Sequence, residues 1–97
     1  MYRHFFELGT SDKNLVEHKQ SIYDLSDYET DIFENRVLWL DFESDMKKYS
    51  KNFPKVIFTL FQNCENGEKA MYFFKNGKMQ NANVRLISDK FDEDKLV

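Results

Sequence analysis

Two Asn-Gly pairs, each set between runs of β-branched and aromatic residues, constrain this sequence more than any other feature. Residues 53–61 read FPKVIFTLF and precede Asn66-Gly67, and a second run ends at Lys75, directly before Asn76-Gly77. Asn and Gly tolerate the positive φ angles of a two-residue hairpin turn, and β-branched and aromatic side chains favour strands. We therefore predict an antiparallel meander of three strands, over residues 56–61, 69–75 and 79–87. In the last strand the side expected to face the core consists of Gln80, Ala82, Val84 and Leu86, and the side expected to face outwards consists of Met79, Asn81, Asn83 and Arg85.

The first quarter of the chain predicts one strand and leaves the next element open. Residues 2–8 alternate loosely between two faces and end at Gly9, which favours a strand. Residues 12–23 have apolar residues at roughly helical spacing after several candidate N-caps, which favours a helix. A hairpin followed by a second strand over residues 16–25 fits the same stretch, and the sequence does not decide between them.

The middle of the chain predicts a short strand and then a helix. Residues 37–40, Val-Leu-Trp-Leu, form a continuous apolar run that is typical of a central strand buried on both faces, with Trp39 in the core. Asp41 is placed to cap a helix that runs to about Asn52 and that Pro54 ends. The apolar stripe that would pack on the sheet consists of Phe42, Met46, Tyr49 and Phe53.

Length and composition predict a single folded domain over residues 1–97. Of these residues, 41% are hydrophobic, which suffices for one core. The charged tail from about residue 89 is expected to be frayed, although Phe91 could dock. The order of predicted elements indicates an α+β fold, with a ferredoxin-like antiparallel sheet of about four to five strands and one or two helices on one face.

A family resemblance supports the same fold. Trp39, residues 41–46, residues 49–60 and residues 72–80 together resemble a group of small ferredoxin-like proteins of unknown function, found in bacteria, phages and other mobile elements. The resemblance covers about the middle half of the chain and depends on structural residues, so it implies a fold more than a function. The chain departs from the group at residues 61–67, where that group tends to carry a Gly- and Glu-rich turn.

Several kinds of chemistry lack their usual sequence patterns. His4 and His18 are far apart and in no metal-binding spacing, and the scattered glycines form no phosphate-binding loop, so we expect no metal, no cofactor and no enzymatic activity. Cys64 is the only cysteine and predicts a reduced thiol without a catalytic role. No apolar run reaches the roughly 18 to 20 residues that span a bilayer, and the first residues do not resemble a signal peptide. These observations predict a cytoplasmic protein.

Nucleic-acid binding is a secondary hypothesis. Ferredoxin-like sheets can stack bases on exposed aromatic side chains, but a net charge of −3 lacks the usual basic footprint. The alternative is that the aromatic residues are core and that the lysines protect the hairpin ends from edge pairing. The face in question would consist of Phe61, Tyr72, Phe73, Lys69, Lys75, Lys78 and Arg85.

The charge pattern suggests a protein partner. Between residues 24 and 45 Arg36 is the only base among eight acids, which form either a solvated rim or a surface for a basic partner. Our leading hypothesis is a non-enzymatic inhibitor, encoded by a phage or mobile element, that mimics phosphates on a host defence complex, in the manner of an anti-CRISPR protein. The alternative is a homodimer that pairs through the edge strand 79–87. The predicted contact residues are Asp24, Asp27, Glu29, Asp31, Glu34, Asp41, Glu43 and Asp45.

Overall fold

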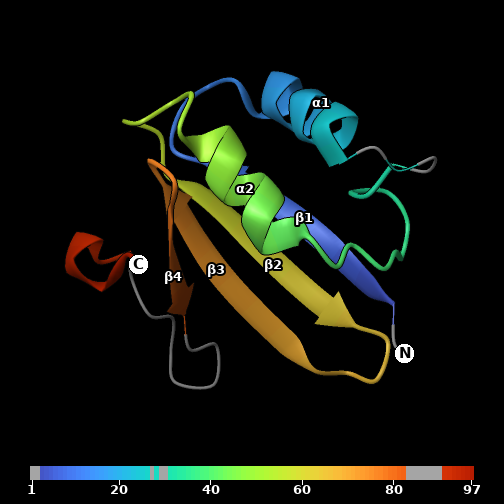
Figure 1. Ribbon diagram of the computed structural model, residues 1–97. Coiled ribbons are helices and arrows are strands. Elements are labelled where there is room, and N and C mark those ends of the chain that lie inside the picture. The colour runs from blue at the N-terminus through green and yellow to red at the C-terminus, as the bar shows by residue number, and fades with distance from the viewer. Residues whose placement is uncertain (1–2, 27, 29–30, 83–90) are drawn as a thin grey trace.

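An antiparallel sheet with the strand order β1-β2-β3-β4 forms one layer of the molecule (Figure 1). The computed structural model describes residues 3–26, 28, 31–82 and 91–97. Each strand pairs with the strand that follows it along the chain, so the sheet is a meander. The strands are β1 (His4–Thr10), β2 (Phe58–Cys64), β3 (Lys69–Lys75) and β4 (Lys78–Ala82).

Two helices form the second layer and cover one face of the sheet (Figure 1). Helix α1 (Leu15–Ser26) and helix α2 (Phe42–Ser50) both lie between β1 and β2 in the chain, and a 3₁₀ turn, η1 (Glu93–Lys95), follows the sheet. The predicted α+β fold with helices on one face is confirmed. The element order differs from the ferredoxin-like one, which places one helix in each of two βαβ units, because here both helices come between β1 and β2.

The structure decides between the alternatives for the first helix and bears out the last hairpin. The stretch that fitted either a helix or a strand forms α1, which turns His18 and Ile22 into the interior. At the second Asn-Gly pair, Asn76 and Gly77 have φ angles of 50° and 80°, as a type I′ turn requires. The strand predicted over residues 79–87 is described as β4 up to Ala82, and residues 83–87 lie outside the described part of the chain.

The main core lies between the sheet and the helices. Alternate residues of the strands point towards the helical layer, and aromatic side chains fill most of the space between the layers. Three members of the stripe predicted for α2 pack here, with Met46 and Tyr49 buried and Phe42 partly buried, whereas Phe53 lies beyond the end of α2 and is 37% exposed. The buried residues of this cluster are Phe6, Leu8, Ile22, Ile32, Phe33, Val37, Trp39, Met46, Tyr49, Phe58, Leu60 and Phe74.

The strand predicted over residues 37–40 is wrong. Val37 makes a single β-bridge, in which its N–H and C=O both bond to His4 at 2.8 Å. Beyond it, the Trp39 ring turns into the core against Phe6, 5.2 Å away between centroids, and Leu40 is 66% exposed. Trp39 is buried as predicted. Its side chain fills the space under the helical layer, and the backbone beyond Val37 therefore leaves the edge of β1 and forms no strand.

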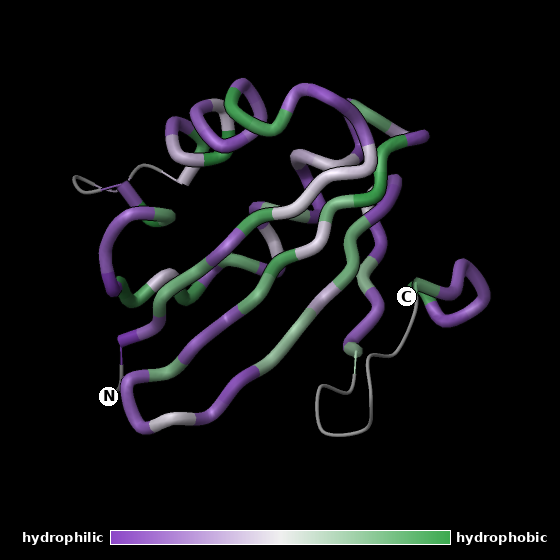
Figure 2. The backbone as a smooth tube through the Cα atoms, turned by 180° about the vertical axis from the view of Figure 1, so that it is seen from behind, coloured by the Kyte–Doolittle hydropathy of each residue, from purple (hydrophilic) through white to green (hydrophobic). Residues whose placement is uncertain are grey.

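The opposite face of the sheet carries a second, smaller cluster. Figure 2 shows this face, with the helices on the far side of the sheet. Met71, Phe73 and Ala82 are buried there, with Ile57 and Phe91 packed against them. Gln80 and Ala82 were expected on the core side and are buried, but the residues that shield this face come from the end of the chain.

Two further expectations for this region are corrected. The tail from about residue 89 was expected to be frayed, with Phe91 able to dock, and in the structure Phe91 docks with its ring centroid 5.6 Å from that of Phe73, while the rest of residues 91–97 also packs on β3 and β4. Residues 89–90 lie outside the described part of the chain. Met79 was expected to point outwards, but it is partly buried against the main core.

Candidate functional site

Two of the eight predicted contact residues act as hydrogen-bond acceptors inside the fold. Asp45 Oδ2 accepts the indole N–H of buried Trp39 at 2.8 Å. Asp31 Oδ1 accepts the backbone N–H of Phe33 at 2.9 Å and closes a turn that begins at Asp31 itself. These two carboxylates therefore stabilise the connection between α1 and α2.

Four other predicted contact residues lie at the surface, and we call them the acidic surface: Asp24, Glu34, Asp41 and Glu43. Asp24 accepts a hydrogen bond from Gln20 at 3.0 Å. The nearest bases are Lys19, 3.9 Å from Glu34, and Lys47, 3.0 Å from Glu43. Exposed ion pairs of this kind contribute little to the free energy of folding, so these carboxylates remain accessible to a partner. Asp27 and Glu29 lie outside the described residues.

The acidic surface gathers on one side of the helical layer. The C-terminal end of α1 and the N-terminal end of α2 both face that side, and residues 31–41 run along it (Figure 1). Leu40 is exposed beside Asp41, so an apolar side chain adjoins the carboxylates. An apolar centre with a charged rim is a common composition for a protein interface.

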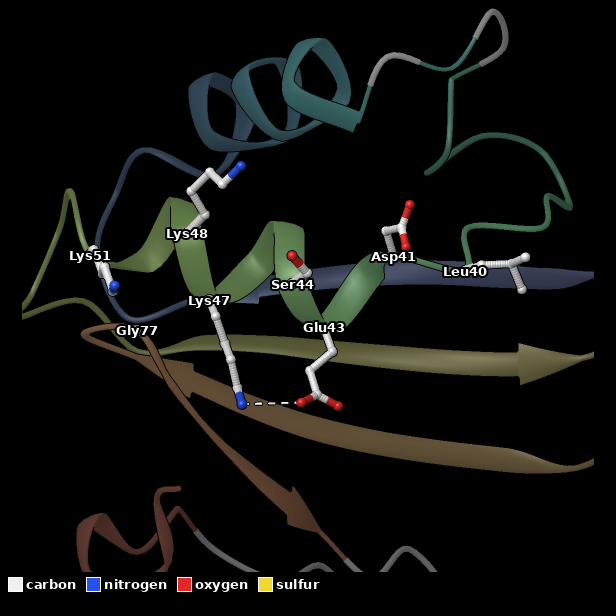
Figure 3. Close-up of a pocket in the computed structure, with 8 residues that line it drawn as sticks. All are labelled: Leu40, Asp41, Glu43, Ser44, Lys47, Lys48, Lys51 and Gly77. Carbon is white, nitrogen blue, oxygen red and sulfur yellow. Dashed lines mark ion pairs between the residues drawn. The ribbon is translucent and has the colours of Figure 1, made fainter.

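A shallow groove of about 570 Å³ follows the outer side of α2 and continues the acidic surface (Figure 3). Asp41 and Glu43 line its end at the start of the helix, and lysines line the other end. This order follows the helix dipole, which favours acids near the N-terminus and bases near the C-terminus. The full lining is Leu40, Asp41, Glu43, Ser44, Lys47, Lys48, Lys51 and Gly77.

The basic end of the groove is shaped by the β3–β4 turn. The Ser50 hydroxyl accepts the backbone N–H of Gly77 at 2.8 Å, and the Lys51 side chain lies across the same glycine. A Cβ atom at Gly77 would come within 2.7 Å of two Lys51 carbons. The turn therefore requires glycine for its positive φ, and a Cβ atom there would also displace the exposed Lys51 side chain.

A buried polar relay links α1 to α2. His18 Nε2 lies 2.8 Å from Asp12 Oδ2, and His18 Nδ1 lies 2.6 Å from the Tyr49 hydroxyl. With the Nε2 proton donated to the carboxylate, Nδ1 accepts the tyrosine proton. The rings of Phe53 and Phe58 stand edge-on to the imidazole, with centroid-to-centroid distances of 4.8 and 4.9 Å, and so enclose the His18 ring. The relay therefore acts as an anchor between the helices.

The relay shifts the pKa values of its outer members. The hydrogen bond from His18 lowers the pKa of the Asp12 carboxyl, because it stabilises the carboxylate. Burial raises the pKa of the Tyr49 hydroxyl, and the negative charge of Asp12 acts in the same direction. The sequence analysis missed this cluster. An acid just before a helix and a histidine in its first turns are the only local signal for it, and the tyrosine comes from another helix.

The aromatic face considered for base stacking is divided by the fold. Tyr72 points towards the helices and packs on Phe42, and Phe73 lies beneath Phe91. Phe61 stays 39% exposed. The described aromatic residues therefore do not form a continuous stacking surface on this face.

The described residues show no metal-binding cluster. Cys64 is buried near the end of β2. Among the residues that the structure describes, no three His, Cys, Asp or Glu side chains gather where they could hold a metal ion. Neither described helix is long and apolar enough to cross a membrane.

Comparisons with protein-family models, with curated proteins and with solved structures find no match to this chain. The case for a function therefore depends on the surfaces described above.

Proposed function

We propose that this chain is a non-enzymatic protein-interaction module that binds through the acidic surface. The observation that carries the proposal is exposed Leu40 at the junction of that surface with the α2 groove, where an apolar contact adjoins Asp41 and Glu43. Burial of a leucine gives affinity, and carboxylates around it select a basic partner and speed its association.

The partner class that suits this surface is a protein that binds nucleic acid. Its phosphate-binding site is basic, and carboxylates on a folded protein can occupy the positions of phosphates. Under this proposal the chain inhibits a nucleic-acid-handling complex of a host, in the way expected of a phage- or mobile-element-encoded inhibitor.

The test neutralises the acidic surface without disturbing the fold. Asp24→Asn, Glu34→Gln, Asp41→Asn and Glu43→Gln are combined, because amides keep the size and the hydrogen-bond acceptor of each carboxylate. The matched control neutralises four exposed acids on other parts of the molecule, with Glu7→Gln, Glu65→Gln, Glu68→Gln and Asp94→Asn. Circular dichroism establishes that both variants are folded.

Tagged wild-type protein is used to capture partners from lysate of its native host, and added DNA or RNA is then used to compete for them. We expect a stoichiometric nucleic-acid-binding protein that nucleic acid and high salt both release. The neutralised variant should lose it and the control should keep it. Equal capture by both variants, or capture that nucleic acid does not disturb, would contradict the proposal.

A further inference from the structure

The segment formed by residues 91–97 occupies the outer edge of β4. Met79 N–H donates to Val97 O at 2.8 Å, and Val97 N–H donates to Met79 O at 2.9 Å. Two residues that exchange both bonds form the hydrogen-bonded pair of an antiparallel ladder. Asp92 N–H adds a bond of 2.7 Å to Gln80 Oε1, also on β4. Val97 therefore stands where the next strand of the sheet would begin.

Side chains of β3 hold the same segment at two further points. The Phe91 ring packs edge-to-face on the Phe73 ring. Lys75 Nζ lies 2.8 Å from Glu93 Oε1 and 5.9 Å from the centre of the Phe91 ring. Small Ala82 on β4 belongs to the same apolar cluster and leaves room for the ring to reach β3. The sheet thus recognises an aromatic side chain and a carboxylate that follows it two residues later.

The sheet and residues 91–97, which form the two sides of this contact, differ in how strongly the rest of the fold holds them in place. Phe73 belongs to β3, which is paired on both sides with β2 and β4, whereas Val97 is 76% exposed and the Glu93 side chain 65%. Segments that bury little apolar surface open at a low free-energy cost. The receptor side is therefore preformed, and the bound segment is easily displaced.

A true strand would also use this edge more fully than residues 91–97 do. The 3₁₀ turn η1 precedes Val97, so the segment reaches the edge at Met79. Hydrogen-bonding direction alternates along a strand, and Asn81 therefore directs its backbone N–H and C=O to the same edge as Met79. A partner in extended conformation can pair with both residues.

We propose that the β4 edge, with Phe73 and Lys75, is a peptide-docking site that residues 91–97 occupy in cis. Its occupant in trans is an extended segment of a protein partner, which carries an aromatic side chain followed two residues later by a carboxylate. Binding of this kind is strand addition. In the absence of the partner, residues 91–97 cover the edge and the apolar cluster and so protect them from aggregation. This site is separate from the acidic surface.

The test uses the full chain with a weakened cis contact, in the variant Phe91→Ala/Glu93→Lys. The probe is a synthetic peptide with the sequence of residues 91–97, followed through the backbone amide signals of the ¹⁵N-labelled protein. We expect saturable shifts at Met79, Asn81 and Phe73, with an affinity at least about tenfold higher than for the wild-type chain, where the cis segment competes. Asp94→Lys makes the same charge change at an exposed neighbour and should behave like the wild type.

A second pair of reagents tests the recognition of charge and does not depend on the first variant. Lys75→Glu should weaken binding of the original peptide and favour a peptide in which lysine replaces its glutamate. Two results would overturn the proposal: no saturable shifts at Met79 and Phe73 in any variant, or equal affinity of the double variant and the wild type together with no charge preference in Lys75→Glu.

Discussion

Replacement of Asp45 by alanine should destabilise the fold through Trp39. The Trp39 side chain is buried and its indole N–H donates to Asp45 Oδ2 at 2.8 Å, so Asp45→Ala leaves a desolvated donor, at a cost of about 1 to 3 kcal/mol. Asp45 also lies in the first turn of α2, where loss of a negative charge costs about 0.3 to 1 kcal/mol. We expect the free energy of unfolding to fall by about 2 to 3 kcal/mol, and the melting temperature by about 8 to 20 °C.

Urea denaturation followed by circular dichroism measures this loss in both backgrounds used below, and the fluorescence of the single tryptophan adds a second probe wherever Trp39 is kept. In a Trp39→Phe background, which lacks the donor, Asp45→Ala should cost only its helix-dipole share, less than about 1 kcal/mol. Asp45→Asn keeps an acceptor and should lose about 1 kcal/mol. An equal cost of Asp45→Ala in both backgrounds would refute the reasoning, because the hydrogen bond would then carry none of the effect.

Two further substitutions test the anchor between the helices and the β3–β4 turn. The pKa of Asp12 is lowered from its ordinary value of 3.8, so its contribution to stability is complete above that pH and is lost as the pH falls through the lower folded value. In Asp12→Asn, the free energy of unfolding should therefore fall less steeply with decreasing pH at the acid end of the curve than in the wild type. An equally steep fall in both proteins would count against the His18 hydrogen bond. Gly77→Ala should cost about 1 to 2 kcal/mol from its positive φ and more from the clash with Lys51, whereas Gly67→Ala, also at positive φ but with no atom near its added Cβ, should cost the strain alone. Thermal melts compare the two, and Lys51→Ala should remove the difference between them.

Elements with strong local signals were predicted well. The type I′ turn follows from the φ preferences of two adjacent residues, Asn76 and Gly77, and the inward stripe of α2 follows from its spacing. These signals act within one element, so no knowledge of distant residues is needed. The choice of α1 over a strand needed the fold, because residues 16–25 suit either structure in isolation.

Predictions that depend on neighbours in space were less successful. The apolar run at residues 37–40 was expected to be a central strand, but Trp39 fills the space under the helices, and within the described residues the backbone of the run pairs with the sheet through one bridge at Val37. Periodicity likewise identified the buried side of Gln80, but it could not show that residues far along the chain cover it.

The acidic residues show most clearly which properties follow from the sequence and which follow from the tertiary structure. The sequence by itself determined that carboxylates crowd the stretch from Asp24 to Asp45, that a hairpin forms at Asn76-Gly77, and that Trp39 is buried. Only the tertiary structure decided that Asp45 bonds to Trp39 while Asp41 faces solvent beside Leu40. The physical reason is range: turn and helix preferences arise from a few adjacent residues, whereas the role of a carboxylate depends on which donor the packing of other segments brings within about 3 Å of it.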